Sequence, residues 1–249
     1  MSSMITKTEA VVLRTVEYQE SSIIATLFTL KHGKIAVIAK GARKPKSKFS
    51  AFLVPGQMLE VVYYMKHTRQ VQTLSDTSYL KKLDNLRFDL QKMALVTITM
   101  ELTDQLLHEN EVNESLFQFL SSLLPWLNDE DSVSKIMFPY IQIRLAQLLG
   151  IGIQIVIEEQ VSPKTGYINV KSGTLSTESY DSDSLRLTPG QFQFVRESLQ
   201  SMKSSIFDID LTKNELNSLI DHLDKYFRYH IEGVRPRKSD AIFEQLLET

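Results

Sequence analysis

The first third of the chain contains short apolar runs in which hydrophobic and polar residues tend to alternate, as they do in β-strands. Polar or glycine-containing turns separate these runs, for example at Gly33 and at Pro55-Gly56. Strands at this spacing favour a small closed barrel of the oligonucleotide-binding type, in which the sheet curls on itself. An SH3-like barrel or a small sandwich fits the pattern nearly as well. The predicted strands cover residues 6–16, 22–30, 34–39, 58–65 and 70–78.

From about residue 80 the apolar period changes from two to about 3.6, which is typical of amphipathic helices. Leu86, Leu90 and Met93 begin this pattern and predict one long helix that ends near His108. Asn113 is expected to cap the next helix, because an asparagine side chain accepts a hydrogen bond from the first unpaired backbone amides of a helix.

A third helix is predicted over about residues 133–149. Pro139 lies inside this pattern, so the helix either starts or kinks there. Gly150 is expected to end it, since glycine readily adopts the left-handed conformation that terminates helices. An irregular β-like patch and a polar loop follow over residues 151–184.

Capping residues mark two further helix starts. Thr188-Pro189 combines a good N-cap with a proline at the first helical position. Thr212 and Glu215 have the spacing of a capping box. A last amphipathic segment covers residues 240–247.

These patterns predict an α+β protein of two domains. The first, over residues 1–80, is a five-stranded barrel of the oligonucleotide-binding type. The second, over residues 81–249, is an α-helical bundle that carries the irregular insertion at residues 151–184. A chain of 249 residues with 43% hydrophobic content can bury enough apolar surface to form these two domains.

The formal net charge of −2 hides an uneven distribution along the chain. Residues 1–80 contain eleven Lys and Arg residues against five Asp and Glu residues, a balance of +6, so the remainder carries −8. A basic front and an acidic back place any contact with a polyanion in the first domain.

The positive charge is concentrated in the stretch KHGKIAVIAKGARKPKSKF, from Lys31 to Phe49. Seven Lys and Arg residues lie between Glu20 and Glu60, and no acidic residue separates them. Such a run is often only a solvated loop. Here it follows a predicted strand, and aromatic residues interleave with the cations. That composition is typical of a groove that follows a phosphate backbone while bases stack on aromatic rings.

We therefore predict that this stretch binds nucleic acid. Its cations contact phosphates largely without regard to sequence, because the loop shows no hydrogen-bonding code for bases. Phe49 and Phe52 either stack on bases or fill the mouth of the barrel. The predicted binding residues are Arg14, Lys34, Lys40, Arg43, Lys44, Lys46, Lys48 and Phe49.

No catalytic motif stands out. The sequence contains neither a G-x-x-x-x-G-K-[ST] phosphate loop nor a G-x-S-x-G nucleophile motif. The absence of cysteine excludes disulfides, thiol catalysis and thiolate zinc sites. The five histidines are scattered. We expect a protein that is not an enzyme and that holds no metal ion or cofactor.

Signals for export or membrane insertion are also missing. The N-terminal sequence MSSMITKTEAVV lacks the apolar core of a signal peptide. The most apolar stretches are too short to cross a bilayer. The sequence therefore predicts a soluble cytoplasmic protein without membrane contacts.

The stretch from residue 8 to residue 49 reads TEAVVLRTVEYQESSIIATLFTLKHGKIAVIAKGARKPKSKF. It resembles the RecO family of bacterial DNA repair proteins. Weaker similarity lies in R-L-A-Q-L-L-G at residues 144–150 and around residues 233–239. The order of a β domain followed by a helical domain also agrees, so the resemblance covers essentially the full chain. Its features are the opening TEA-x-VL-R, the Glu20-Ser21 pair, the Leu27-Phe28-Thr29 strand, the H-G-K turn and the basic loop K-G-A-R-x-x-K-S.

The resemblance implies an oligonucleotide-binding barrel, a helical bundle and a role in recombinational repair. It implies that the chain binds single- and double-stranded DNA and anneals complementary strands. It also implies that the chain engages single-stranded-DNA-binding protein and RecR, and helps RecA to replace the former on gapped DNA.

One departure from the family concerns metal. Many members carry a four-cysteine zinc finger after the helix that ends in L-L-G, and here the corresponding patch, residues 151–175, has no cysteine. We expect a metal-free β-hairpin in its place. The residues expected to hold it are Ile153, Ile155, Ile157, Tyr167 and Ile168.

The resemblance also implies that the helical domain takes the acidic, apolar C-terminal tail of single-stranded-DNA-binding protein into a groove. A terminal carboxylate needs a cation beside an apolar slot. Arg144, with Leu145 and Leu148, is the predicted partner site. The alternative is an arginine at a helix surface that is paired with an acid.

Two other functions remain open from the sequence. An RNA-binding barrel would use the same basic strand and would prefer RNA through its 2′-hydroxyls. A protein adaptor would bind partners with its helices, and its basic loop would only be solvated.

Overall fold

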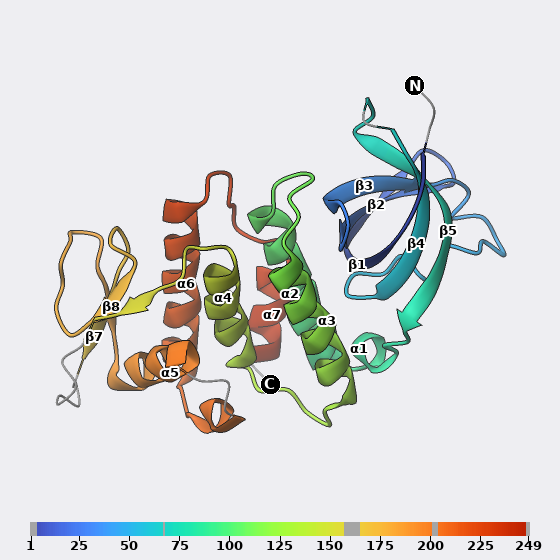
Figure 1. Ribbon diagram of the computed structural model, residues 1–249. Helices are drawn as coiled ribbons and strands as arrows, with labels where there is room; N and C mark the ends of the chain where they lie inside the picture. Colours follow the sequence, from blue (N-terminus) through green and yellow to red (C-terminus); the bar gives the residue numbers. More distant parts are fainter. Residues whose placement is uncertain (1–3, 67, 157–164, 201–203, 248–249) are drawn as a thin grey trace. The chain divides into compact units, whose positions relative to one another are not determined.

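Figure 1 shows the computed structural model of the protein. By its internal contacts the chain divides into two units. The first comprises residues 1–131 and 236–249, and the second comprises residues 132–235. This division falls inside the helical region, so the first helices and the C-terminal segment group with the barrel. The structure describes residues 4–66, 68–156, 165–200 and 204–247.

The first unit begins with a closed five-stranded barrel in the order β1-β2-β3-β5-β4 (Figure 1). Neighbouring strands are antiparallel except β3 and β5, which are parallel. A small five-stranded barrel of this kind is the oligonucleotide-binding fold, and it confirms the predicted fold class. The strands are β1 (Met4–Tyr18), β2 (Ser22–Thr29), β3 (Gly33–Ala39), β4 (Met58–Met65) and β5 (Val71–Lys81).

Mostly small and branched side chains fill the barrel. Leu27 of β2, Val37 of β3 and Val61 of β4 are fully buried in one cluster. Each alternates along its strand with a residue that faces outward, which is why the period of two predicted these strands. The barrel interior is therefore a packed core and leaves its outer face for other contacts.

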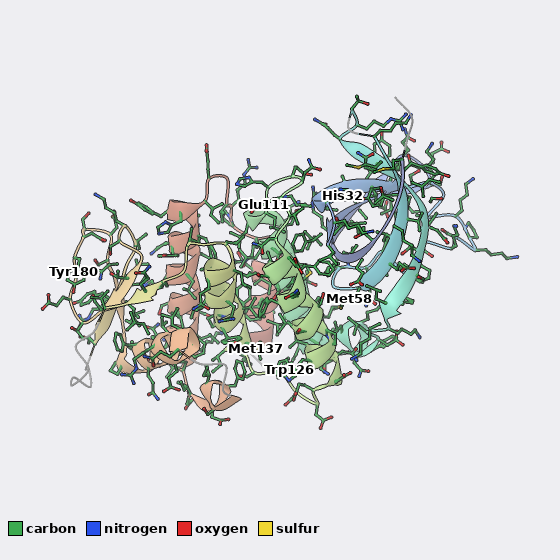
Figure 2. All side chains as sticks on the ribbon, in the orientation of Figure 1. His32, Met58, Glu111, Trp126, Met137 and Tyr180 are labelled. Carbon is green, nitrogen blue, oxygen red and sulfur yellow. The ribbon has the colours of Figure 1, made fainter. Side chains whose placement is uncertain are left out.

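Helices of the same unit pack against the outside of the barrel. The ring of Phe28 on β2 lies 5.7 Å, centroid to centroid, from that of Phe117 on α3. Gly33 has a φ of 62°, and a Cβ there would lie 1.9 Å from the carbonyl oxygen of Glu111. Only glycine fits this turn. Figure 2 labels His32, the residue before Gly33, and Glu111, whose carbonyl Gly33 approaches. The helices are α1 (Asn85–Phe88), α2 (Leu90–Leu106), α3 (Glu114–Asp129) and α7 (Asp240–Leu247).

The prediction of one long helix that ends near His108 is confirmed by the length and the end of α2, but it is wrong at the start, where the helix is broken. Strand β5 continues to Lys81, and α1 is separated from α2 by Asp89, whose backbone is extended (φ −97°, ψ 120°). The Asp89 side chain accepts a hydrogen bond from the backbone amide of Lys92 and so caps α2. Apolar spacing alone did not reveal this break, because Asp89 fits an exposed helical position equally well.

The predicted N-cap of the next helix is confirmed. Asn113 accepts a hydrogen bond from the backbone amide of Leu116 at the start of α3. Pro125 lies inside α3, in its second half, and does not end it.

The C-terminal helix α7 confirms the predicted segment at residues 240–247, and it packs against α2. The carboxylate of Glu101 on α2 accepts hydrogen bonds from the backbone amides of Lys238 and Ser239, at 2.8 and 3.0 Å. It also accepts one from the Ser239 hydroxyl at 2.6 Å. Next to it, the buried Arg237 donates to the carboxylate of Asp240 at 2.7 Å. These bonds fix the start of α7 on the first unit.

The second unit combines helices with a small sheet. Helix α4 has Pro139 in its first turn and is followed by Gly150 with a φ of 78°, so the helix starts near the proline and ends at the glycine. Thr188 caps α5 and the Thr212–Glu215 capping box starts α6, as predicted. The helices are α4 (Met137–Leu148), α5 (Pro189–Gln200) and α6 (Lys213–His230), with a short 3-10 helix at Ser204–Asp208.

The predicted hairpin is part of a four-stranded sheet in the order β6-β8-β7-β9. Strands β7 and β8 form the hairpin, in which Ile168 is fully buried; Ile153 is buried just before β6. Residue 157 lies outside the described residues. The buried Asn169 joins the sheet to the following loop, through the Ser176 and Ser184 hydroxyls and the Tyr180 amide. The strands are β6 (Gln154–Ile155), β7 (Gly166–Asn169), β8 (Thr174–Ser176) and β9 (Leu185–Leu187).

The Glu101 contacts predict a pH-dependent contribution to stability. Burial alone would raise the pKa of Glu101, but the hydrogen bonds from Ser239 and Lys238 and the nearby Arg237 charge outweigh it and lower the pKa. The stabilisation is therefore present above the pKa of an unfolded glutamate and is lost as the pH falls through the lower folded value. Glu101→Gln should reduce the free energy of unfolding at pH 7 by about 1–2 kcal/mol.

Urea unfolding at pH 7 and in the acid range measures this effect. The deficit of Glu101→Gln should shrink as the pH falls. The exposed Glu20→Gln serves as the matched control and should change little at either pH. Equal deficits for Glu101→Gln at both pH values would show that its charge does not hold α7.

Candidate nucleic-acid interface

The connection between β3 and β4 divides its side chains between the barrel interior and the solvent. Ala42, Phe49 and Leu53 are buried in the barrel core, at 0%, 7% and 4% exposure. The five cations between them and at their flanks are exposed. We call these cations the basic loop: Lys40, Arg43, Lys44, Lys46 and Lys48.

Phe49 belongs to the core and not to the surface. The expectation that it contacts DNA needs correction, because a ring with 7% exposure offers no face to a base. Phe52 is partly buried against the same core, and its ring lies 4.5 Å from that of Tyr79. The Tyr79 hydroxyl donates to the carbonyl of Ala51 at 2.7 Å. Both phenylalanines therefore close the barrel and anchor the basic loop.

Two cations of the basic loop are tied to neighbouring strands. Arg43 forms an ion pair with Glu17 at 2.9 Å and donates to the carbonyl of Gln19. Lys48 forms an ion pair with Asp76 at 2.9 Å. The hydrogen bond from the Lys48 ammonium and its charge lower the pKa of Asp76. These contacts fix the two ends of the basic loop, and they reduce the net positive charge there.

Lys40, Lys44 and Lys46 are exposed, and the described part of the chain offers their ammonium groups no hydrogen bond or ion pair. Lys46 adopts a left-handed backbone conformation with a φ of 65°. These three lysines are the uncompensated cations of the loop. Phosphate contact needs such groups, because a cation that already has an acidic partner gains less from a second anion.

Lys34 and Arg14 lie elsewhere, beside α2. Lys34 is buried; its ammonium donates to the carbonyl of Asp104 at 2.7 Å and lies 3.6 Å from the carboxylate of the same residue. Arg14 bonds the same carboxylate at 2.8 Å and stays more than half exposed. Lys34 therefore helps to hold α2 on the barrel and is closed to a phosphate. The predicted cations do not form one continuous surface.

Sequence reasoning missed the acidic partners Asp104, Glu17 and Asp76. Asp104 lies 70 residues from Lys34, so only the packing of α2 on the barrel brings them together. Glu17 and Asp76 precede and follow the acid-free stretch in the sequence. Both lie close to the end of a predicted strand, over residues 6–16 and 70–78, and this was the available signal.

The predicted partner site lies on α4 in the second unit. Arg144 is partly buried; its Nη1 donates to the side chain of Gln147 at 2.6 Å, and its Nε is buried without a hydrogen-bond partner among the described residues. Leu145 is fully buried, whereas Leu148 is partly exposed. Burial raises the pKa of Tyr140, one turn before Arg144, and the charge of Arg144 opposes that rise. Arg144 and Leu148 are thus accessible together, and Leu145 supports them from inside.

Neither a metal centre nor a membrane span is found in the part of the chain that the structure describes. No group of three or more His, Cys, Asp or Glu side chains there has a metal-binding arrangement. None of the described helices combines the length and the apolar character needed to cross a bilayer.

A closed five-stranded barrel with an exposed cationic loop places this chain in the class of oligonucleotide-binding-fold proteins. Two family models match it: "Recombination protein O N terminal" over residues 1–82 and "Recombination protein O C terminal" over residues 87–240. The chain belongs to the recombination protein O (RecO) family.

Several proteins named DNA repair protein RecO are similar to this chain, some over nearly its whole length and others over a little more than half of it. The one from Chloroherpeton thalassium is 28% identical over 258 residues, covering 98% of this chain and 100% of that protein. The one from Salinibacter ruber is 40% identical over 148 residues, or 59% of this chain and 57% of that protein. The one from Bacillus subtilis is 35% identical over 148 residues, with the same two shares.

The burial of Phe49 predicts a large loss of stability when its ring is removed. Phe49→Ala should lower the free energy of unfolding by about 3–4 kcal/mol, as for other buried phenylalanines. Phe88 is 81% exposed, so Phe88→Ala is a matched control and should shift it by less than about 0.5 kcal/mol. Chemical denaturation of the three proteins measures this. Similar small effects for both substitutions would mean that Phe49 does not close the barrel.

Proposed function

We propose that this protein acts in recombinational DNA repair by binding single- and double-stranded DNA through the basic loop and annealing complementary strands. The observation that carries the proposal is the exposure of Lys40, Lys44 and Lys46, which have no acidic partners in the described part of the chain, on a loop anchored in an oligonucleotide-binding barrel. Membership of the RecO family supports the same role, since its relatives are named DNA repair proteins.

The proposed binding is electrostatic and independent of base sequence. Lysine ammonium groups neutralise phosphates and release counterions from the DNA, so the affinity falls as the salt concentration rises. Arg43 and Lys48 remain partly exposed beside their carboxylate partners and contribute less. Arg14 lies beyond the loop, beside α2, and contributes only if the strand extends that far.

Annealing then follows without any catalytic residue. A cationic surface that holds two strands offsets the repulsion between their phosphates and raises their local concentration. Base pairing supplies the specificity. No bond is made or broken, so the activity needs neither a nucleophile nor a metal ion.

The proposed partners are single-stranded-DNA-binding protein and RecR, with which the chain would help RecA to replace the former on gapped DNA. For the C-terminal tail of the single-stranded-DNA-binding protein, the proposed contact is Arg144. Arg144 is only partly buried, so the exposed part of its guanidinium can meet a terminal carboxylate. Leu148 would meet the apolar side chains of the tail.

The salt dependence of DNA binding tests the basic loop. Each phosphate neutralised on a single strand contributes about −0.7 to the slope of log affinity against log salt concentration. Replacing Lys40, Lys44 and Lys46 together with Ala should therefore make the slope about 2 less negative. Fluorescence anisotropy with a labelled oligonucleotide of thymidines, from about 50 to 200 mM salt, measures the slope.

A matched control removes three exposed lysines elsewhere: Lys82, Lys171 and Lys225 to Ala. It changes the net charge equally and should leave the slope nearly unchanged. If the two triple variants behave alike, the basic loop is not the DNA site.

The partner site is tested with a synthetic acidic, apolar peptide that ends in a free carboxylate. Arg144→Ala should weaken peptide binding about tenfold or more, because it leaves the carboxylate without its cation. The peptide with an amidated C-terminus should bind the parent protein and Arg144→Ala equally weakly. Calorimetry measures both. Full peptide affinity in Arg144→Ala would remove this residue from the site.

A further inference from the structure

The outer face of the barrel carries more apolar side chains than solvent exposure requires. In an antiparallel sheet with one solvated face, polar residues normally occupy that face. Strands β2 and β3 instead have apolar residues on both faces. Ile24 and Phe28 of β2 and Ile38 of β3 all face outward, since their neighbours Ala25, Leu27 and Val37 lie in the core. An apolar outer face of this kind is expected to be covered, either by other parts of the chain or by a bound ligand.

The helices cover only part of this face. Phe28 is fully buried under α3, and Lys34 is buried beside α2. Thr26, two residues before Phe28, is also buried, with 4% exposure. Ile24 and Ile38, further along the same strands, are partly exposed. The described helices of this unit leave that end of the face open.

The open part continues around the barrel as a line of directly paired residues. Strand registers join Val16 to Ile24, Ile24 to Ile38 and Ile38 to Thr73. The line goes on from Thr73 to Tyr64 and from Tyr64 to Ile5. Directly opposite residues share one face of a sheet, so all these side chains point outward. We call this line the outer stripe: Val16, Ile24, Ile38, Thr73, Tyr64 and Ile5.

The outer stripe is open to solvent and contains exposed aromatic surface. Val16, Tyr64 and Ile5 are 49%, 39% and 65% exposed. Tyr18, two residues after Val16 on the same face of β1, is 42% exposed. Half-exposed tyrosine rings on strands offer flat surfaces to a ligand at little entropic cost.

Cations border the outer stripe. Lys40 comes two residues after Ile38 and begins the basic loop. Arg14 comes two residues before Val16 on the same face of β1, and it forms an ion pair with Asp104. Glu17 points to the opposite face of the strand, where it pairs with Arg43. The outer stripe thus lies between positive groups, and its ligand is expected to combine negative charge with flat apolar groups.

We propose that the outer stripe is the base-binding part of the DNA site and that it takes unpaired single-stranded DNA, with Tyr18 and Tyr64 stacking on bases. The inference rests on the proposed function, because the basic loop holds the phosphates of the same strand. A single strand matches both the apolar surface and the cations, since its bases can unstack and its backbone is anionic. A duplex matches only the cations, because its bases are stacked inside the helix. On this proposal the outer stripe favours single strands over duplex DNA.

Substitution of the two tyrosines tests the proposal. Tyr18→Ala and Tyr64→Ala should each weaken binding to a thymidine oligonucleotide roughly 5- to 150-fold, the range for loss of one stacked base. Binding to duplex DNA should change less than about twofold, and the salt slope should stay the same. Tyr18→Phe and Tyr64→Phe keep the ring and should keep the affinity. Both tyrosines are exposed, so circular dichroism should report unchanged folding.

A direct optical signal comes from Tyr18→Trp in a chain with Trp126→Phe, because Trp126 is the single tryptophan of the sequence. Stacking on a base should quench the fluorescence of the new tryptophan when thymidine oligonucleotide is added. Duplex DNA at equal occupancy should leave it nearly unchanged.

The outcomes separate the two proposals. If the triple lysine variant loses salt dependence while the tyrosine variants bind single strands normally, the DNA site stands and the outer stripe is not part of it. If an apolar peptide binds over Tyr18 and Tyr64 and DNA does not, the outer stripe is likewise not part of the DNA site. If neither set of variants alters DNA binding, the proposed function fails as well.

Discussion

The insertion of Phe49 into the end of the barrel is the contact on which the proposed DNA site depends. A run of like charges repels itself and would normally be an extended, solvated segment. Here Ala42, Phe49 and Leu53 enter the core, and their burial offsets the cost of holding lysines side by side. The same chain segment therefore closes the barrel and presents a fixed cationic surface. The residues that stabilise the barrel and the lysines that carry the positive charge therefore belong to the same loop.

Ion pairs divide the cations of the barrel into two groups. Some hold the structure together, and others are left to contact a ligand. Asp104 holds Lys34 and Arg14, and so joins the barrel to α2. Glu17 and Asp76 hold the two ends of the basic loop. Lys40, Lys44 and Lys46 have no acidic partner among the described residues, and they belong to one loop next to an exposed apolar face. This division explains how a protein with a net charge of −2 carries a locally positive loop.

The sequence predicted those parts of the structure that depend on local pattern. The barrel strands follow from a period of two and glycine turns, and the starts of α3, α5 and α6 follow from capping residues such as Asn113 and Thr212. Contacts between distant residues were not predictable. The charge of Lys34 gave no sign that Asp104 would bury it, and the ring of Phe49 suited a base or a barrel core equally well. The outer stripe also needed the structure, because it consists of residues from all five strands that only the strand registers bring into line.

Lysine reactivity in the presence of DNA tests the central claim most directly. Acylation of surface lysines, read by mass spectrometry with and without a saturating thymidine oligonucleotide, reports which ammonium groups the strand covers. Lys40, Lys44 and Lys46 should react freely in the unbound protein and be protected by DNA, while the buried Lys34 should react slowly in both. Unchanged reactivity of Lys44 and Lys46 at saturating DNA would contradict the account.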